Sequence, residues 1–310
     1  MKILGISFGT KNGTNDTMCK VALKGAQDAG ADVEFIQMST LDIKHCTGCC
    51  ACVKTLLSGR GSMCVLKDDF EWLLDKMKDA DGIVVSDPIF EEGASGLFHT
   101  IMDRFGPRTD RGNNIIGTKV AEATGGKIPD PRMLKDKVIS FMGIGGSDWG
   151  TRVQCEHAML ALTPMWKVID NAWFPWAKEL IMDDERLEQV RQIGLNIVEA
   201  AKDFEKSSYQ GEEGVCPHCH NRLFYLEPGT NKAICGLCGI VGEVNVVDGK
   251  TEFTFPEEQL GHAHDTLPGK FIHGDDIKNM EASLTEAKKT PEFKERKAAY
   301  DFVEPLKKVN

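Results

Sequence analysis

Two groups of cysteines are the residues of this chain best suited to metal or redox chemistry. The chain has 11 cysteines in 310 residues. The first cysteine group is Cys46, Cys49, Cys50, Cys52 and, after residues 53–63, Cys64; the second is Cys216, Cys219, Cys235 and Cys238. Two thiolates two residues apart can bind one tetrahedral ion from a single turn. This spacing raises the question of which group is structural and which transfers electrons.

The second cysteine group has the spacing of a four-cysteine ribbon, because two Cys-x2-Cys pairs flank residues 220–234. Cys216, Cys219, Cys235 and Cys238 are therefore expected to bind one ion tetrahedrally. The spacing does not separate zinc from a single rubredoxin-type iron, since both accept four thiolates. Zinc would only hold a small domain together, whereas iron would relay electrons.

Composition and charge restrict the class of protein. The formal net charge of −10 argues against a general nucleic-acid binder, because phosphate contacts need clustered Lys and Arg. No apolar run reaches the roughly 18 residues of a membrane span. The first residues enter a predicted strand without a signal-peptide pattern. We therefore expect a cytoplasmic protein with neither a membrane nor a nucleic-acid partner.

Strands and helices alternate up to about residue 206. Apolar runs predict strands over 2–8, 32–37, 82–86, 138–142 and 166–172, and periodicity predicts helices over 14–29, 69–80, 95–105, 151–162 and 183–206. Five strands with helices on both faces fit an α/β doubly wound parallel sheet. Residues 107–136 are predicted to be a long connection that covers the site, carries Arg108 and Arg111 toward an anion, or is mobile.

Composition divides the chain into four parts. The predicted core domain covers 1–206, and a polar, glycine-containing linker covers 207–214. A small four-cysteine domain with short β-prone segments covers 215–258. The extension over 259–310 is rich in Lys and Glu toward its end, and we expect a surface helix or tail that docks on a neighbour or another subunit.

Three polar or glycine-rich loops are expected to leave the carboxyl ends of the strands at the switch point of the sheet, where open α/β sheets bind ligands. Hydroxyls and backbone N–H groups in the first loop suit an anion at a helix start, although a plain hydrophilic loop is the alternative. Glycines and aromatic rings in the other two suit a flat ring. The candidate binding residues are Ser7, Thr10, Lys11, Asn12, Gly13, Thr14 and Asn15; Pro88, Ile89, Phe90, Glu91 and Gly93; and Gly143, Gly145, Gly146, Ser147 and Trp149.

These loops, together with the Cys-x-Gly-Cys-x-x-Cys run at 46–52, resemble the NAD(P)H-dependent FMN reductase family and its iron–sulfur flavoprotein branch, over residues 1 to about 174. Phe8 and Gly9 depart from the Pro-Arg pair usual in the family's phosphate loop. The resemblance implies a flavodoxin-like fold, FMN at a dimer or tetramer interface, and hydride chemistry with a nicotinamide.

The first cysteine group differs from the iron–sulfur branch, because residues 53–63 separate Cys52 from Cys64 where the family's spacers are short. One interpretation is that Cys46, Cys49, Cys52 and Cys64 bind a [4Fe–4S] cluster, with Cys50 spare. The other is a loop of reduced thiols that pack as small hydrophobic groups near the flavin.

Three functions remain open from the sequence. The leading one is an FMN-dependent oxidoreductase that takes hydride from NAD(P)H and passes electrons to a quinone-like, aromatic or unsaturated acceptor, with no dedicated acid–base pair visible. The second is an electron carrier with FMN and a [4Fe–4S] cluster that uses ferredoxin as its partner. The third is a non-catalytic adaptor built on a zinc ribbon. A homodimer or homotetramer is expected for the first two.

Overall fold

Five parallel strands form the central sheet of the chain. In the computed structural model, which describes residues 1–306, they are β1 (Lys2–Ser7), β2 (Asp32–Gln37), β3 (Gly82–Pro88), β4 (Val138–Ile144) and β5 (Lys167–Phe174). Their order is β2-β1-β3-β4-β5, which is the flavodoxin-like order. All five predicted strands are confirmed, with ends that shift by two residues or fewer.

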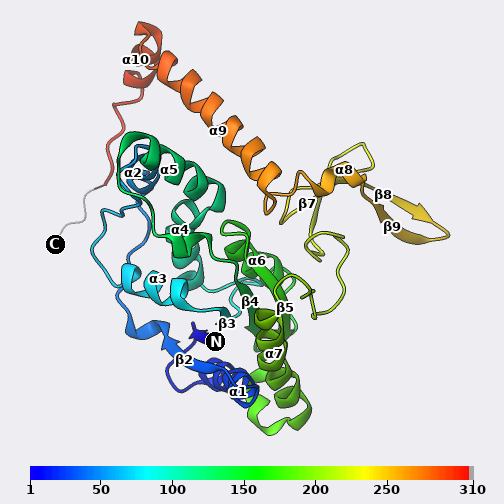
Figure 1. Ribbon diagram of the computed structural model, residues 1–310. Coiled ribbons are helices and arrows are strands. Elements are labelled where there is room, and N and C mark those ends of the chain that lie inside the picture. The colour runs from blue at the N-terminus through cyan, green and yellow to red at the C-terminus, as the bar shows by residue number, and fades with distance from the viewer. Residues whose placement is uncertain (307–310) are drawn as a thin grey trace.

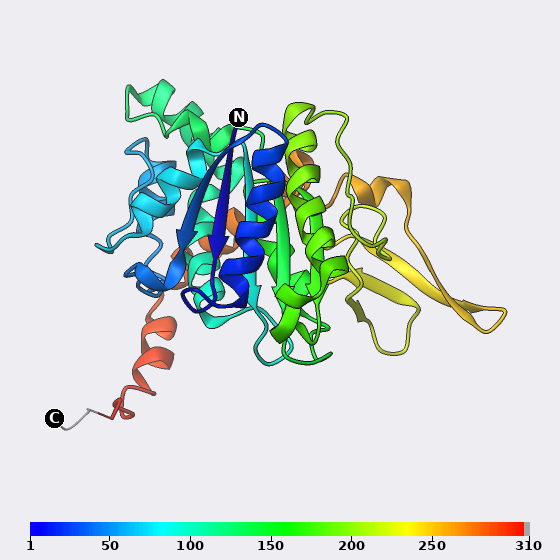
Figure 2. The same cartoon turned by 90° about the horizontal axis from the view of Figure 1, so that it is seen from below.

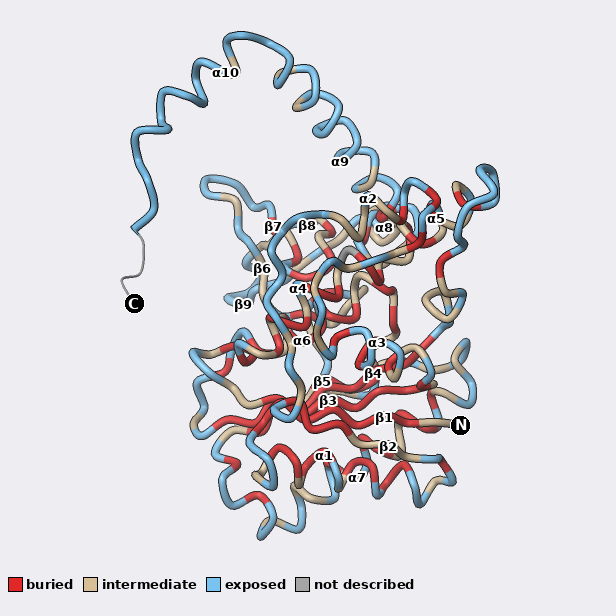
Figure 3. The backbone as a smooth tube through the Cα atoms, turned by 90° about the vertical axis from the view of Figure 1, so that its left-hand side faces the viewer, coloured by how far each residue is buried: buried red, intermediate tan, exposed pale blue. Residues whose placement is uncertain are grey.

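Helices cover both faces of this sheet (Figures 1 and 3). One face carries α1 (Thr14–Asp28) and α7 (Asp184–Lys202), and the other carries α3 (Phe70–Asp79), α4 (Gly96–Thr109) and α6 (Val153–Leu162). Successive strand residues point to opposite layers. Ile3 packs in the α1–α7 layer and Leu4 in the α3–α4–α6 layer. Both faces are therefore buried, as a doubly wound sheet requires.

The prediction of a long connection over 107–136 is wrong. The α4 helix continues to Thr109, α5 (Arg111–Thr124) follows at once, and a short 3₁₀ helix covers Pro131–Leu134. The carboxylate of Asp110 accepts a hydrogen bond from the Asn113 N–H at 2.8 Å and so caps α5. Glycines and asparagines in this stretch concealed the helix. Arg108 pairs with Glu71 and Arg111 with Asp136, so neither arginine is available to an anion.

A four-stranded antiparallel sheet carries the second cysteine group. Its strands are β6 (Phe224–Leu226), β7 (Lys232–Cys235), β8 (Val241–Val247) and β9 (Lys250–Thr254), in sequential order. Asp248 and Gly249 have φ values of 50° and 75°, which fit the two-residue turn between β8 and β9. The predicted linker is not free, because the Gln210 N–H donates to the Ile169 carbonyl of β5 at 2.7 Å. The small sheet is thus attached to the core.

The remaining helices lie outside the two layers. They are α2 (Ala51–Leu57), between β2 and α3, and α8 (Glu257–Leu260), α9 (Leu267–Ala287) and α10 (Pro291–Ala298), which end the described chain. Figure 1 shows α9 and α10 extending away from the body. Within residues 1–306, we find no helix both long enough and apolar enough to cross a membrane.

Asp170 is a buried carboxyl in β5 whose ionisation opposes folding. It is 4% exposed and accepts hydrogen bonds from Asn196 at 3.1 Å and Ser140 at 3.4 Å. Burial raises the pKa of Asp170 from 3.8 to about 6. Because the folded state holds this proton more tightly than the unfolded state, the free energy of unfolding falls as the pH rises from about 4 to about 6.

Replacing Asp170 by asparagine removes this ionisation and keeps the shape of the side chain. At about 1.4 kcal/mol per pKa unit, we expect Asp170→Asn to exceed the wild type in stability by up to about 3 kcal/mol above about pH 6, and to lose this advantage below about pH 4. Urea unfolding at both ends of that range measures the difference, with the exposed Asp32→Asn as control. An equal difference at both pH values would contradict the burial argument.

Candidate functional site

The three predicted loops meet at one edge of the sheet. They follow β1 (residues 8–13), β3 (residues 89–95) and β4 (residues 145–152), and these strands are neighbours in the sheet. The Phe8 N–H donates to the Ser86 carbonyl at 2.8 Å, and the Ile89 N–H donates to the Ile144 carbonyl at 3.0 Å. Figure 2 shows the carboxyl ends of the strands pointing to the same side. The loops are brought together as predicted.

The first loop offers an open helix start. Gly13 precedes α1 and provides no side-chain cap, while Thr10, Lys11 and Asn12 are exposed. Asp16 fixes the position of the loop, since its carboxylate accepts a hydrogen bond from the Asn12 N–H at 2.7 Å. N–H groups at an uncapped helix start attract anions, so this end of α1 fits a phosphate group.

Some predicted binding residues point inward instead. The Ser7 hydroxyl donates to Asp16 at 2.5 Å, and the Asn15 side-chain oxygen accepts from the Ser86 hydroxyl at 2.9 Å. Gly143 lies inside β4 rather than in the loop after it, and it is buried. These three residues shape the loops, and their direct contact with a ligand stays a prediction.

A fully buried carboxylate anchors the second loop. Asp87, at the end of β3, accepts hydrogen bonds from the Ser95 N–H at 2.8 Å and the Ser95 hydroxyl at 2.6 Å. His157 of α6 is also fully buried, and its Nε2 lies 3.1 Å from the same carboxylate. These contacts tie both ends of the loop to α6. The sequence alone does not reveal this pairing, because it joins residues 70 positions apart.

The tip of the second loop is a tight turn pressed against α6. Phe90 and Gly93 exchange two backbone hydrogen bonds of 3.0 Å, and the Ala94 N–H donates to Glu156 at 2.7 Å. A Cβ atom on Gly93 would lie 2.2 Å from the Glu156 carboxylate, so a larger residue would displace this carboxylate from the Ala94 N–H. Glu91 has a φ of 48° and helps to close the turn. Phe90 remains 62% exposed at the rim.

The third loop is bonded to the segment that follows β5. The Gly145 N–H donates to the Phe174 carbonyl at 3.0 Å, and the Ala177 N–H donates to the Gly145 carbonyl at 3.0 Å. Trp149 and Trp176 are 59% and 62% exposed on these two segments. The edge therefore presents aromatic faces beside backbone groups. An isoalloxazine ring needs such a surface, so the residues present fit FMN.

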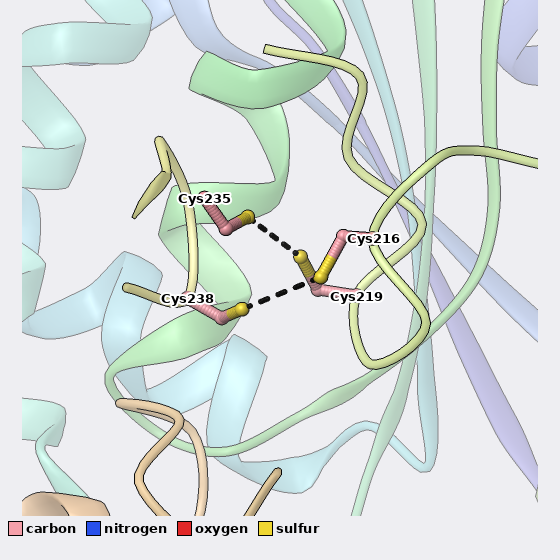
Figure 4. A group of neighbouring side chains, drawn as sticks. All are labelled: Cys216, Cys219, Cys235 and Cys238. Atoms are coloured by element: carbon pink, nitrogen blue, oxygen red, sulfur yellow. Dashed lines mark hydrogen bonds between the residues drawn. The ribbon is translucent and has the colours of Figure 1, made fainter. Parts of the chain in front are cut away.

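The second cysteine group forms a compact four-sulfur site (Figure 4). All four Sγ atoms lie within 4.8 Å of one another, with Cys216 and Cys238 3.6 Å apart and Cys219 and Cys235 3.5 Å apart. The side-chain amide of Asn221 donates to the Cys235 sulfur at 3.5 Å. The predicted ligand set is thus assembled, and it is able to bind a metal ion.

The first cysteine group lies between β2 and α3, and its cavity is bounded by the second half of α4. One cavity of about 90 Å³ is lined by all five cysteines of this group, Cys46, Cys49, Cys50, Cys52 and Cys64. Arg104 and Arg108 line the same cavity. Arg104 donates to the Cys64 sulfur at 3.5 Å. Among the described residues, only the second group brings its sulfur atoms as close as 4.8 Å.

Two thiols of the first group differ in acidity. The Ala51 N–H lowers the pKa of the exposed Cys49 by hydrogen bonding to its sulfur, whereas burial raises the pKa of Cys52. Cys49 is therefore the more acidic of the two thiols.

Comparison with known proteins agrees with the loop geometry. Residues 1–179 match the NADPH-dependent FMN reductase family. The chain belongs to this family. A solved structure of a flavone reductase is 59% identical and covers 100% of both chains, with a TM-score of 0.89. An iron–sulfur flavoprotein from Methanocaldococcus jannaschii is 27% identical over 65% of this chain and 98% of its own, and a flavone synthase from Aspergillus candidus is 24% identical over 83% of each.

Membership of the NADPH-dependent FMN reductase family confirms the resemblance found in the sequence. The chain is an oxidoreductase, and FMN is the cofactor of its family. The family match ends at residue 179, so the four-cysteine sheet and the helices α8, α9 and α10 lie outside it. Because this is an enzyme family, we do not retain the interpretation as a non-catalytic adaptor.

Proposed function

We propose that this enzyme uses NAD(P)H and FMN to reduce the C2–C3 double bond of a flavone, giving a flavanone. The observation that supports this substrate most strongly is the end-to-end likeness to a flavone reductase at 59% identity. A flavone is an unsaturated, planar, aromatic ketone, and so it falls within the acceptor classes that the sequence predicts. Its double bond is conjugated to the carbonyl, which makes the β carbon electrophilic.

Bound FMN would supply hydride transfer from the nicotinamide to the acceptor, and a proton from solvent would complete the reduction. In this proposal, the chain itself binds and orients both molecules. The start of α1 holds the phosphate, while the turn at Phe90 and the third loop hold the ring. Phe90, Trp149 and Trp176 then offer flat apolar faces to the rings of the flavone. We assign no side chain as a proton donor.

Product analysis tests this function. The FMN-loaded protein is incubated without oxygen with a flavone and NADPH or NADH, and the product is examined by mass spectrometry and NMR. We expect a gain of two hydrogens with loss of the C3 vinyl signal and retention of the carbonyl. Reduction of the carbonyl, or no reaction with either nicotinamide, would contradict the proposal.

Trp176 offers a test of the aromatic rim that leaves the flavin loops unchanged. We expect Trp176→Ala to raise the KM for the flavone about fivefold, because a lost aromatic contact costs about 1 kcal/mol. Steady-state kinetics measures this, with FMN content as a check. Trp72 is an exposed tryptophan on α3 and provides the control, since Trp72→Ala should leave the KM unchanged. Equal effects of both substitutions would contradict a role for the rim.

A second candidate function is electron transfer through a [4Fe–4S] cluster, with ferredoxin as partner. The observation that favours it is the 90 Å³ cavity lined by all five thiols of the first cysteine group. Arg104 donates to the Cys64 sulfur at 3.5 Å and would keep this hydrogen bond to a sulfur ligand of such a cluster. Iron and acid-labile sulfide are measured on protein purified without oxygen. Absence of sulfide would remove this candidate.

We further propose zinc at the second cysteine group. Four thiolates in a compact tetrahedral set are typical of a closed structural site. A visible charge-transfer band that disappears on reduction would indicate iron instead.

A further inference from the structure

The end of the described chain forms an arm that makes little contact with the body. We define the arm as residues 275–306, which include most of α9, all of α10 and the tail that follows. Near the start of α9, Lys270 donates to Asp110 of the α4–α5 junction at 2.7 Å. Beyond it, every residue of the arm is exposed except Leu284, Ala287 and Phe293, which are partly buried. Figures 1 and 3 show the arm standing clear of the body.

The arm carries apolar side chains on one face of α9 and in the tail. Ile277, Met280 and Leu284 follow helical spacing, and the first two are 47% and 58% exposed. Tyr300 and Phe302 are 74% and 80% exposed. Helices in proteins obtain most of their stability from packing of an apolar face against other elements. A helix that exposes this face therefore lacks a packing partner.

A second exposed apolar surface lies at the carboxyl edge of the central sheet. We call it the edge patch, and it consists of Phe90, Trp149, Trp176, Ile181 and Met182. It borders the flavin loops, and large exposed apolar patches mark interaction sites. Figures 2 and 3 place α10 and the tail on the side to which the strands' carboxyl ends point, away from the body. The end of the arm and the edge patch therefore both lie toward the carboxyl side of the sheet.

We propose that the arm packs on a second copy of this chain, where its tail covers the partner's edge patch beside FMN. Both apolar surfaces belong to one chain and lie toward the carboxyl side of its sheet, so a two-fold pair is able to bury both surfaces of both copies at once. A partner of different sequence would need to match two unrelated surfaces. Charges of both signs alternate in α10, as in Lys294, Glu295 and Arg296, which does not suit an anionic membrane surface.

This arrangement gives the arm a role in the active site. The aromatic rings of Tyr300 and Phe302 from one copy would enclose the flavin and substrate of the other, and so exclude water. The proposal rests on the FMN site of the family and not on the identity of the substrate. Its failure is therefore distinguishable from failure of flavone reduction.

The first test measures mass and flavin exposure in the FMN-loaded protein. Sedimentation velocity is expected to give a dimer or a multiple of it for the wild type, and a monomer for the double variant Ile277→Glu/Met280→Glu. Asn279→Glu adds a charge at an exposed polar position of the same helix and should leave the mass unchanged. The tail variant Tyr300→Ser/Phe302→Ser should keep the dimer and raise FMN loss about tenfold. A monomeric wild type, or unchanged mass in the double variant, would overturn the proposal.

The second test identifies the chain that the tail contacts. A photo-crosslinking phenylalanine replaces Phe302 in a mixture of ¹⁵N-labelled and unlabelled protein. We expect crosslinks between labelled and unlabelled chains, with peptides that contain Trp176 and Met182. Crosslinks confined to single chains would show that the arm folds back on its own body, and this result would overturn the exchange.

Discussion

Asp87→Asn is expected to weaken FMN binding at least tenfold and to lower the free energy of unfolding by about 2 kcal/mol, because an amide cannot accept all the hydrogen bonds of the carboxylate. Asp87 accepts from the N–H and hydroxyl of Ser95 and lies 3.1 Å from His157. All of these groups are buried, so a donor left unpaired has no access to water. The loop over 88–95 would then lose its fixed position at the flavin ring.

Fluorescence of released FMN measures the binding constant, and urea unfolding of the flavin-free protein measures stability. Asp184→Asn is the control, since this carboxyl is exposed at the start of α7 and far from the loops in sequence. The binding constant reports on the position of the loop, and urea unfolding reports on the stability of the core. A fall in stability alone would mean that Asp87 supports the core without positioning the loop. Wild-type values for both would contradict the role of this carboxylate.

Cys238→Ser is expected to abolish metal binding at the second cysteine group and to unfold the small antiparallel sheet. Cys238 is fully buried, and its sulfur lies 3.6 Å from that of Cys216. Structural metal sites of this kind contribute the folding free energy of the small domains that contain them. We expect one ion per chain in the wild type and none in the variant, with fast amide hydrogen exchange over 215–258.

Cys155→Ala provides the matched control for the metal prediction. Cys155 lies on α6 in the same buried cluster as Cys216 and Cys238, but it does not belong to the four-sulfur set. The control should retain the ion, because it changes the packing around the site without removing a ligand. If Cys238→Ser kept a full complement of metal, or Cys155→Ala lost it, the assignment of the four ligands would be wrong.

The sequence predicted the elements whose signals are local. Continuous apolar runs gave the five strands, and two Cys-x2-Cys pairs gave the four-sulfur site at Cys216, Cys219, Cys235 and Cys238. The three loops were found because the carboxyl ends of parallel strands must meet at one edge. These inferences need only periodicity, spacing and sheet topology.

The parts that the sequence did not predict depend on contacts between distant residues. The pairing of Asp87 with His157 and the contact of Glu156 with the turn at Gly93 join β3 to α6 across the fold. The helix α5 was not predicted, because the glycines and asparagines that follow its N-cap, Asp110, have weak helix propensity. Domain boundaries at 206 and 214 stay predictions, although the attachment of Gln210 to β5 shows that the linker is held.

One anaerobic experiment tests whether electrons pass from a nicotinamide through FMN to a flavone. NADPH, and separately NADH, is added to the FMN-loaded protein without a mediator, and a flavone is added once the visible flavin band has bleached. We expect that the nicotinamide bleaches the flavin, that the flavone restores the colour, and that one flavanone forms per flavin reoxidised. A flavin that neither nicotinamide reduces, or a reduced flavin that a flavone leaves bleached, would contradict this expectation.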